Sequence, residues 1–119
     1  MAERALFIGF GTPVRGREQR AVGVFNAFVE MFGRMSADGR IERVEVTLID
    51  PHGGDLGGFF LVHGTAAQCA ALPTDAEFRE AMIDASLVVD NLGVVGALSG
   101  EAVGPEMASY GAAIGKLGA

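Results

Sequence analysis

The sequence predicts an α+β domain in which a four-stranded antiparallel sheet carries helices on one of its faces. Apolar residues follow strand-like and helix-like periods in the order strand, helix, strand, strand, helix, strand, helix. The chain of 119 residues is half hydrophobic, which is enough for one core, so we expect a single domain over residues 1–119. Its 18 glycines follow no period and gather at the predicted strand ends and turns.

The first third of the chain predicts a strand, a long helix and a second strand. Residues 5–10 are apolar throughout, as in a strand that is buried on both faces. From Arg17 the apolar residues return at intervals of four and three, which predicts a helix that ends at Asp38 and Gly39. Residues 41–49 then alternate between apolar and polar side chains, as in a strand with one face on a core.

A third strand and two helices follow. Residues 50–55 are rich in turn formers, and the strand that begins at Gly57 or Gly58 and ends at His63 pairs with residues 41–49 through this loop. Helix starts are predicted by two capping boxes, in which a threonine precedes a glutamine or glutamate by three residues. These are Thr65 with Gln68 and Thr74 with Glu77, on either side of Pro73.

The end of the chain predicts one more strand and one more helix. Residues 86–98 are β-branched and apolar, which favours a last strand in which Gly93 could form a bulge. Residues 105–117 predict a short helix with an apolar stripe formed by Met107, Tyr110, Ile114 and Leu117.

Charge and cysteine content exclude several classes of protein. The net charge of −6 argues against a nucleic-acid partner and against binding to an anionic membrane. Cys69 is the only cysteine, which excludes an internal disulfide framework and a cysteine-rich zinc module. No apolar segment reaches the length of a membrane span or a signal peptide, so we expect a cytoplasmic protein, in agreement with an unpaired thiol.

One face of the predicted sheet has no helix over it. It would present Phe59, Leu61 and His63 from one strand, beside a neighbouring strand with Arg43, Glu45 and Thr47. The first of these strands could also turn its other set of side chains to this face, and either choice leaves aromatic or β-branched residues uncovered. A face that mixes aromatic and aliphatic side chains with a few polar groups is typical of an association or ligand site. We therefore expect a homodimer that encloses a cavity. Arg43 is a candidate for the ligand site, and the alternative is a pair with Glu45 in solvent or at an interface.

The order of elements over residues 5–98 resembles that of the dimeric α/β-barrel, ferredoxin-like superfamily, with its βαββαβ arrangement. Its members include antibiotic-biosynthesis-type monooxygenases, YCII-like proteins and stress-responsive α/β-barrel proteins. Residues 51–59, PHGGDLGGF, also resemble a signature of an uncharacterised bacterial family with this fold. The resemblance implies a dimer that binds a small, aromatic or polyketide-like molecule between the helix layer and the sheet, or binds haem. It assigns no role to any residue of this chain, because fold does not determine function.

His63 and Asp90 are the candidate catalytic residues. His63 ends an apolar strand, where it could serve as a general base or a haem ligand; the alternative is a hydrogen bond to a backbone carbonyl. Asp90 interrupts the apolar residues of the last predicted strand, so it either pairs with a donor or lines a pocket as an acid or base. Because strands alternate, Asn91 would face the opposite side from Asp90.

His52 and Asp55 lie in the glycine-rich turn and are candidates for contact with a ligand, since glycines let the backbone approach closely. The alternative is an ordinary hairpin loop. We predict no metal site, because the chain has only two histidines and no diagnostic ligand spacing. The turn is not a phosphate loop, which requires a lysine and an immediately following helix.

These observations favour a small-molecule-binding homodimer with a cavity between sheet and helices, lined by Phe59, His63 and Asn91. The ligand would be small and apolar or aromatic, and no pattern in the sequence indicates a particular cofactor. One alternative is a cofactor-independent oxygenase or isomerase that uses His63 or Asp90 as its base. Another alternative is a non-catalytic interaction module.

Overall fold

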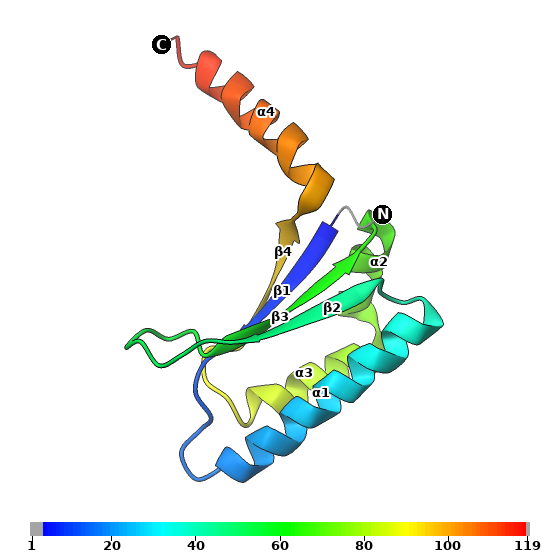
Figure 1. The fold of residues 1–119 in the computed structure, drawn as a ribbon, viewed down its shortest axis with the longest axis vertical. Coiled ribbons are helices and arrows are strands. Elements are labelled where there is room, and N and C mark those ends of the chain that lie inside the picture. The colour runs from blue at the N-terminus through cyan, green and yellow to red at the C-terminus, as the bar shows by residue number, and fades with distance from the viewer. Residues whose placement is uncertain (1–3, 119) are drawn as a thin grey trace.

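A four-stranded antiparallel sheet forms the centre of the protein in the computed structural model, which describes residues 4–118. The strands follow one another across the sheet in the order β2-β3-β1-β4, with α1 and α3 on one face (Figure 1). The predicted α+β class and the antiparallel sheet are thereby confirmed. The strands are β1 (Arg4–Phe10), β2 (Arg43–Leu48), β3 (Gly58–Gly64) and β4 (Gly93–Leu98).

The helix α1 (Glu18–Asp38) is the longest element and covers the sheet. Its apolar stripe faces the core, because residues three and four apart fall on one side of a helix. The buried residues are Ala21, Phe28, Met31, Phe32 and Met35. The helix ends where Gly39 takes a left-handed conformation with φ of 85°, and its N–H donates to the carbonyl of Met35. The predicted ends of this helix are confirmed to within one residue at its start.

Phenylalanine rings from the sheet and from α1 form the core. Ile8 opposes Phe60 in the pairing of β1 with β3, and both side chains are buried under the helices. The centroids of four other rings lie between 5.4 and 5.9 Å from that of Phe60. These rings belong to Phe10, Phe25, Phe28 and Phe32.

The helices α2 (Ala66–Ala71) and α3 (Ala76–Ser86) are separated by a 3-10 turn over Leu72–Thr74. The predicted capping box of Thr65 and Gln68 is present at the start of α2. The second predicted capping box is wrong, because Asp75 caps α3 and its carboxylate accepts the N–H of Phe78 at 3.1 Å. The hydroxyl of Thr74 instead donates back to the carbonyl of Ala71 and closes the preceding turn.

The predicted strand over residues 86–98 is wrong in its first half. Ser86 ends α3, and β4 begins only at Gly93, which opposes Gly9 and forms no bulge. Between them the chain turns, and Val88 is buried against the core. An apolar run without alternation fits a buried connection as well as a strand, so the pattern alone did not separate the two. Asn91 in this connection has a positive φ of 57°.

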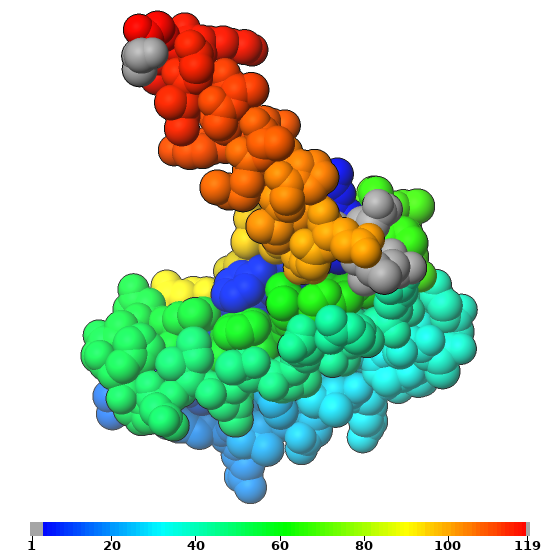
Figure 2. All heavy atoms as spheres, turned by 45° about the horizontal axis from the view of Figure 1, so that its top comes forward, coloured from blue at the N-terminus to red at the C-terminus, as the bar shows by residue number. Residues whose placement is uncertain are grey.

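The last helix, α4 (Val103–Gly115), follows a 3-10 turn over Gly100–Ala102 and extends away from the sheet and the other helices (Figures 1 and 2). None of its residues is buried. The radius of gyration is 16.5 Å, whereas a compact chain of this length has about 14 Å. The protruding α4 accounts for this excess. Among the described helices, none has the length and apolar character needed to cross a membrane.

Candidate functional site

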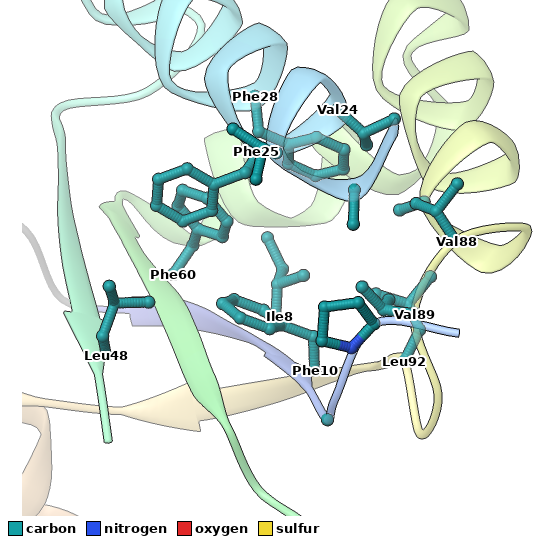
Figure 3. Close-up of a pocket in the computed structure, with 15 residues that line it drawn as sticks. Ile8, Phe10, Val24, Phe25, Phe28, Leu48, Phe60, Val88, Val89 and Leu92 are labelled. Carbon is teal, nitrogen blue, oxygen red and sulfur yellow. The ribbon is translucent and has the colours of Figure 1, made fainter. Parts of the chain in front are cut away.

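The two faces of the sheet hold different candidate sites. On the helix side lies a pocket of about 250 Å³, bounded by the sheet, by α1 and by the connection between α3 and β4 (Figure 3). All of its lining residues are apolar: Ile8, Phe10, Gly11, Pro13, Ala21, Val22, Val24, Phe25, Phe28, Leu48, Phe60, Ala85, Val88, Val89 and Leu92.

Small residues leave the space of this pocket open. Ala21 on α1 and Ala85 on α3 both line it with a single methyl group each. Val22 and Leu48 are 59% and 68% exposed, so they form its rim toward solvent. Since no lining side chain can donate or accept a hydrogen bond, the pocket selects for apolar surface.

The residues predicted to bind a ligand do not line this pocket. Its place between sheet and helices is where the resemblance puts a ligand, but Phe59, His63 and Arg43 lie on the opposite face of the sheet. Asn91 is exposed in the connection before β4, with its side-chain amide beside Gly11. The neighbouring Leu92 contributes to the pocket instead.

The structure decides which side chains of β3 lie on the helix-free face. Phe60 and Val62 are buried under the helices, so alternation along β3 directs Phe59, Leu61 and His63 to the other side. The register sets Glu45 opposite Leu61 on the same face. Phe7 of β1 joins them, and its ring centroid is 5.0 Å from that of Phe59. Phe7 was missed because β1 is apolar at every position, which leaves its facing undetermined.

His63 is 4% exposed and is the one buried polar side chain in the described part of the chain. Its Nε2 lies 2.5 Å from Glu45 Oε1 on β2, and its Nδ1 lies 3.4 Å from the hydroxyl of Ser99, which directly follows β4. The expected alternative, a hydrogen bond to a backbone carbonyl, is not what the structure shows. Ser99 was missed, since a lone serine after a strand gives no sequence signal.

The hydrogen bond to Glu45 determines which ring nitrogen of neutral His63 carries the hydrogen. The hydrogen bond from His63 and the guanidinium of Arg43, 3.2 Å away, hold the pKa of Glu45 below its usual range. Glu45 is therefore a carboxylate at neutral pH, and it accepts a hydrogen bond from a ring N–H of His63. In neutral His63 this makes Nε2 the donor and leaves the lone pair of Nδ1 facing Ser99.

Asp90 lies far from this cluster. Its backbone pairs with the end of β1, since the N–H of Gly11 donates to its carbonyl at 2.7 Å and its own N–H donates to the carbonyl of Thr12 at 2.9 Å. The Asp90 side chain is exposed. In the register, His63 opposes Ala5 while Gly93 opposes Gly9. Asp90 precedes Gly93 and pairs with Gly11, which is six residues from Ala5, so about 20 Å separates the two predicted catalytic residues along the sheet.

His52 and Asp55 are exposed in the loop between β2 and β3. The ring Nδ1 of His52 lies 3.0 Å from the carbonyl of Asp50. Residues 4–118 contain no group of three or more side chains that could hold a metal ion.

Packing explains two glycines of this loop. A Cβ on Gly57 would lie 2.9 Å from the carbonyl oxygen of Gly11, and one on Gly58 would lie 2.7 Å from that of Thr47. Backbone atoms cannot move aside, so both positions require glycine.

The residues present do not fit a haem group. Haem iron is held by an axial histidine, cysteine, methionine or tyrosine, and none of these lines the apolar pocket. Both ring nitrogens of His63 are occupied by Glu45 and Ser99 on the other face of the sheet.

No family model matches the chain, and no curated protein matches it. Its structure is similar to that of a dimeric protein of unknown function and ferredoxin-like fold from Bacteroides fragilis, with a TM-score of 0.60 and 15% identity over 81% of this chain and 96% of the other. The chain has the ferredoxin-like fold. It is also similar to a Chloroflexus aurantiacus protein provisionally named an antibiotic biosynthesis monooxygenase, with a TM-score of 0.52 and 14% identity over 82% and 93%.

At these identities the similarity establishes the fold alone. The expected resemblance to ferredoxin-like proteins is confirmed. The interpretation of residues 51–59 as a family signature stays a prediction.

Proposed function

We propose that this protein is a homodimer that binds a small apolar or aromatic molecule in the pocket between the sheet and the helices. The observation that carries the proposal is the lining of this pocket, in which every side chain is apolar. A dry cavity of about 150 Å³ is large enough for benzene. The present pocket, of about 250 Å³, suits a ligand of one or two rings.

Binding is favoured over oxygenation or isomerisation in this pocket. A cofactor-independent oxygenase or isomerase needs a base within hydrogen-bond reach of its substrate. No titratable side chain lines the pocket, and His63 lies on the opposite face of the sheet. A substrate bound between sheet and helices would therefore have no base beside it.

The homodimer is supported by two uncovered apolar surfaces. The helix-free face presents the partly exposed rings of Phe7 and Phe59, and α4 exposes its whole apolar stripe. Surfaces of this kind are typical of association sites. The Bacteroides fragilis protein of similar fold is itself described as dimeric. The interaction-module alternative would use the same surfaces with a different protein.

A substitution that fills the pocket tests the proposal. Ala21→Leu adds three carbon atoms at a position that lines the pocket, whereas Ala27→Leu makes the same change at an exposed position of α1. We expect 2-naphthol to bind the wild type and Ala27→Leu with equal affinity. For Ala21→Leu we expect the Kd to rise at least about tenfold, which corresponds to about 1.4 kcal/mol. Fluorescence titration measures both.

The thermal midpoint provides a second readout. We expect Ala21→Leu to keep a thermal midpoint close to that of the wild type, because its larger side chain enters open space. In a filled core the same change would cost about 1–3 kcal/mol through overpacking and would lower the midpoint. Equal naphthol binding by both variants, or none by the wild type, would contradict the proposed pocket.

A further inference from the structure

We propose that the helix-free face carries a second, catalytic site, in which Ser99 is a nucleophile for acyl transfer, His63 is its general base and Glu45 positions His63. The substrate class is an activated carboxylic ester or thioester with a small acyl group. This site is separate from the apolar pocket, which lies on the other face of the sheet.

The geometry that supports this site is a chain of three side chains. Glu45 and His63 are 18 residues apart in sequence and their polar atoms are 2.5 Å apart; His63 and Ser99 are 36 residues apart and their polar atoms are 3.4 Å apart. Three separate segments thus converge in the order carboxylate, imidazole, hydroxyl. This order is what activates a weak hydroxyl nucleophile, and it is recognised by geometry rather than by position in the sequence.

The base and the nucleophile differ in how far they are exposed to solvent. The His63 side chain is almost completely enclosed, while Ser99 is partly exposed. The base is therefore shielded from water, and in the single chain the hydroxyl can be reached from the helix-free face. In the register, Ala5 and Ala97 lie beside His63 on this face. Ala5 is buried and Ala97 is partly exposed, so a substrate that reaches Ser99 from this face would meet a methyl side chain rather than a large one.

The direction of proton transfer follows from the hydrogen bonds. The Glu45 carboxylate accepts the Nε2–H of His63, so the lone pair of Nδ1 points to the Ser99 hydroxyl. At 3.4 Å this second hydrogen bond is long, as catalytic hydrogen bonds often are before substrate binds. Arg43, 3.2 Å from Glu45, keeps the carboxylate in place on the exposed side.

The reaction consists of two balanced steps. Ser99 Oγ forms a bond to the acyl carbon while its proton moves to His63 Nδ1; the bond from the acyl carbon to the leaving oxygen or sulfur breaks, and that atom takes the proton from Nδ1. Water then attacks the acyl-serine by the same proton path and releases the carboxylic acid and free Ser99. Neither step needs an oxidant, a reductant or a cofactor.

A serine-directed reagent tests this proposal on the full-length protein. Diisopropyl fluorophosphate reacts with activated serines, and peptide mapping by mass spectrometry locates the adduct. We expect labelling at Ser99 only, with Ser36, Ser86 and Ser109 of the same chain as internal controls. We expect His63→Gln to slow labelling at least about a hundredfold and Glu45→Gln to slow it about tenfold, because removal of a base costs more than removal of its positioning partner.

Matched variants separate activation from folding. Thr47→Ala removes another polar side chain on the same strand and face as Glu45 and should label like the wild type. Glu45 is half exposed, so Glu45→Gln is expected to keep the wild-type circular dichroism and urea midpoint even where His63→Gln does not. The rate of p-nitrophenol release from p-nitrophenyl acetate should follow the same order: the wild type and Thr47→Ala fastest, then Glu45→Gln, and His63→Gln slowest.

Three results would overturn the proposal: no adduct on the wild type, equal labelling of all four serines, or labelling of Ser99 that Glu45→Gln and His63→Gln leave unchanged. Any of these would make the three residues a structural link between β2, β3 and the end of β4.

Discussion

Arg40 shows how one side chain can join distant parts of this fold. It lies between α1 and β2, and its guanidinium contacts Asp38 at 2.8 Å, Asp75 at 3.2 Å and Glu77 at 3.0 Å. Glu77 also pairs with Arg34 of α1. The end of α1 is thereby tied to the start of α3. Arg34, followed by Arg40, holds the pKa of Glu77 below its ordinary value of 4.5.

The network should make stability depend on pH in one direction. A carboxyl group whose pKa is lowered by folding stabilises the protein above its ordinary pKa, and this contribution is lost as pH falls through the lowered pKa. We expect Arg40→Met to lower the urea midpoint at pH 7. The difference from the wild type should shrink below about pH 4 and vanish near pH 2.

Urea unfolding at both pH values checks this prediction. Arg20→Met, at an exposed position of α1, is the control for the loss of one positive charge. If Arg40→Met and Arg20→Met change the midpoint equally at pH 7, the network contributes nothing specific.

At the scale of elements, the start of α3 illustrates a local competition that the tertiary fold resolves. Thr74 and Asp75 can each cap a helix, and both precede an acidic residue of the first turn. Asp75 caps α3 through the N–H of Phe78, because Thr74 is already used by the turn before it. The choice between adjacent caps depends on where the preceding turn ends.

Substitutions at these two positions test the observed cap. Asp75→Ala should destabilise the protein by about 1 kcal/mol, the usual cost of losing a cap, and Asp75→Asn should retain the cap. The difference between these two variants isolates the cap from the ion pair with Arg40, since both lose that charge. Thr74→Ala should cost less than Asp75→Ala in chemical denaturation. The reverse ranking would restore the capping box predicted from sequence.

We expect the helix α4 to be stabilised by a surface outside its own chain. It contains Gly104, Gly111 and Gly115, and each glycine costs a helix about 1 kcal/mol relative to alanine. Isolated helices shorter than about 12–15 residues are marginal in water. With 13 residues and none of them buried, α4 lacks the packing that stabilises most helices in proteins. Association would supply it.

At the scale of the whole molecule, two apolar surfaces are left uncovered by the single chain: the helix-free face and the stripe of α4. We expect sedimentation equilibrium to give twice the chain mass of 12.3 kDa. Val95, on the helix-free face, and Ile114, on α4, are both exposed in the single chain. Val95→Asp and Ile114→Asp should therefore raise the dimer Kd at least about tenfold with little effect on the fold, since a charge in an interface core is costly.

Ala112→Asp places the same charge on the opposite side of α4 and is the matched control. If only one of Val95→Asp and Ile114→Asp weakens the dimer, that result identifies which surface is the interface. A monomeric wild type would contradict the homodimer and favour the interaction module.

The sequence by itself determined the elements whose side-chain spacing is regular. The stripe of α1, its end at Gly39, the alternation of β2 and the order βαββαβ followed from spacing between near neighbours, which is a local property. For β3 the sequence left open which side chains face the helices, and the burial of Phe60 and Val62 in the structure placed Phe59, Leu61 and His63 on the helix-free face. His63 was recognised as a candidate because a histidine at the end of an apolar strand is conspicuous in sequence.

Only the tertiary structure decided where β4 begins and which residues meet. The run of apolar residues before Gly93 has no alternation, so only packing of Val88 against the core distinguishes a buried connection from a strand. Glu45 and Ser99 reach His63 because the antiparallel register places the start of β2 and the end of β4 at the same end of the sheet as His63. The apolar pocket is likewise lined by residues of the sheet, α1 and α3 that are distant from one another in the sequence. Such contacts between distant segments depend on the sheet order and on helix placement, which no local pattern encodes.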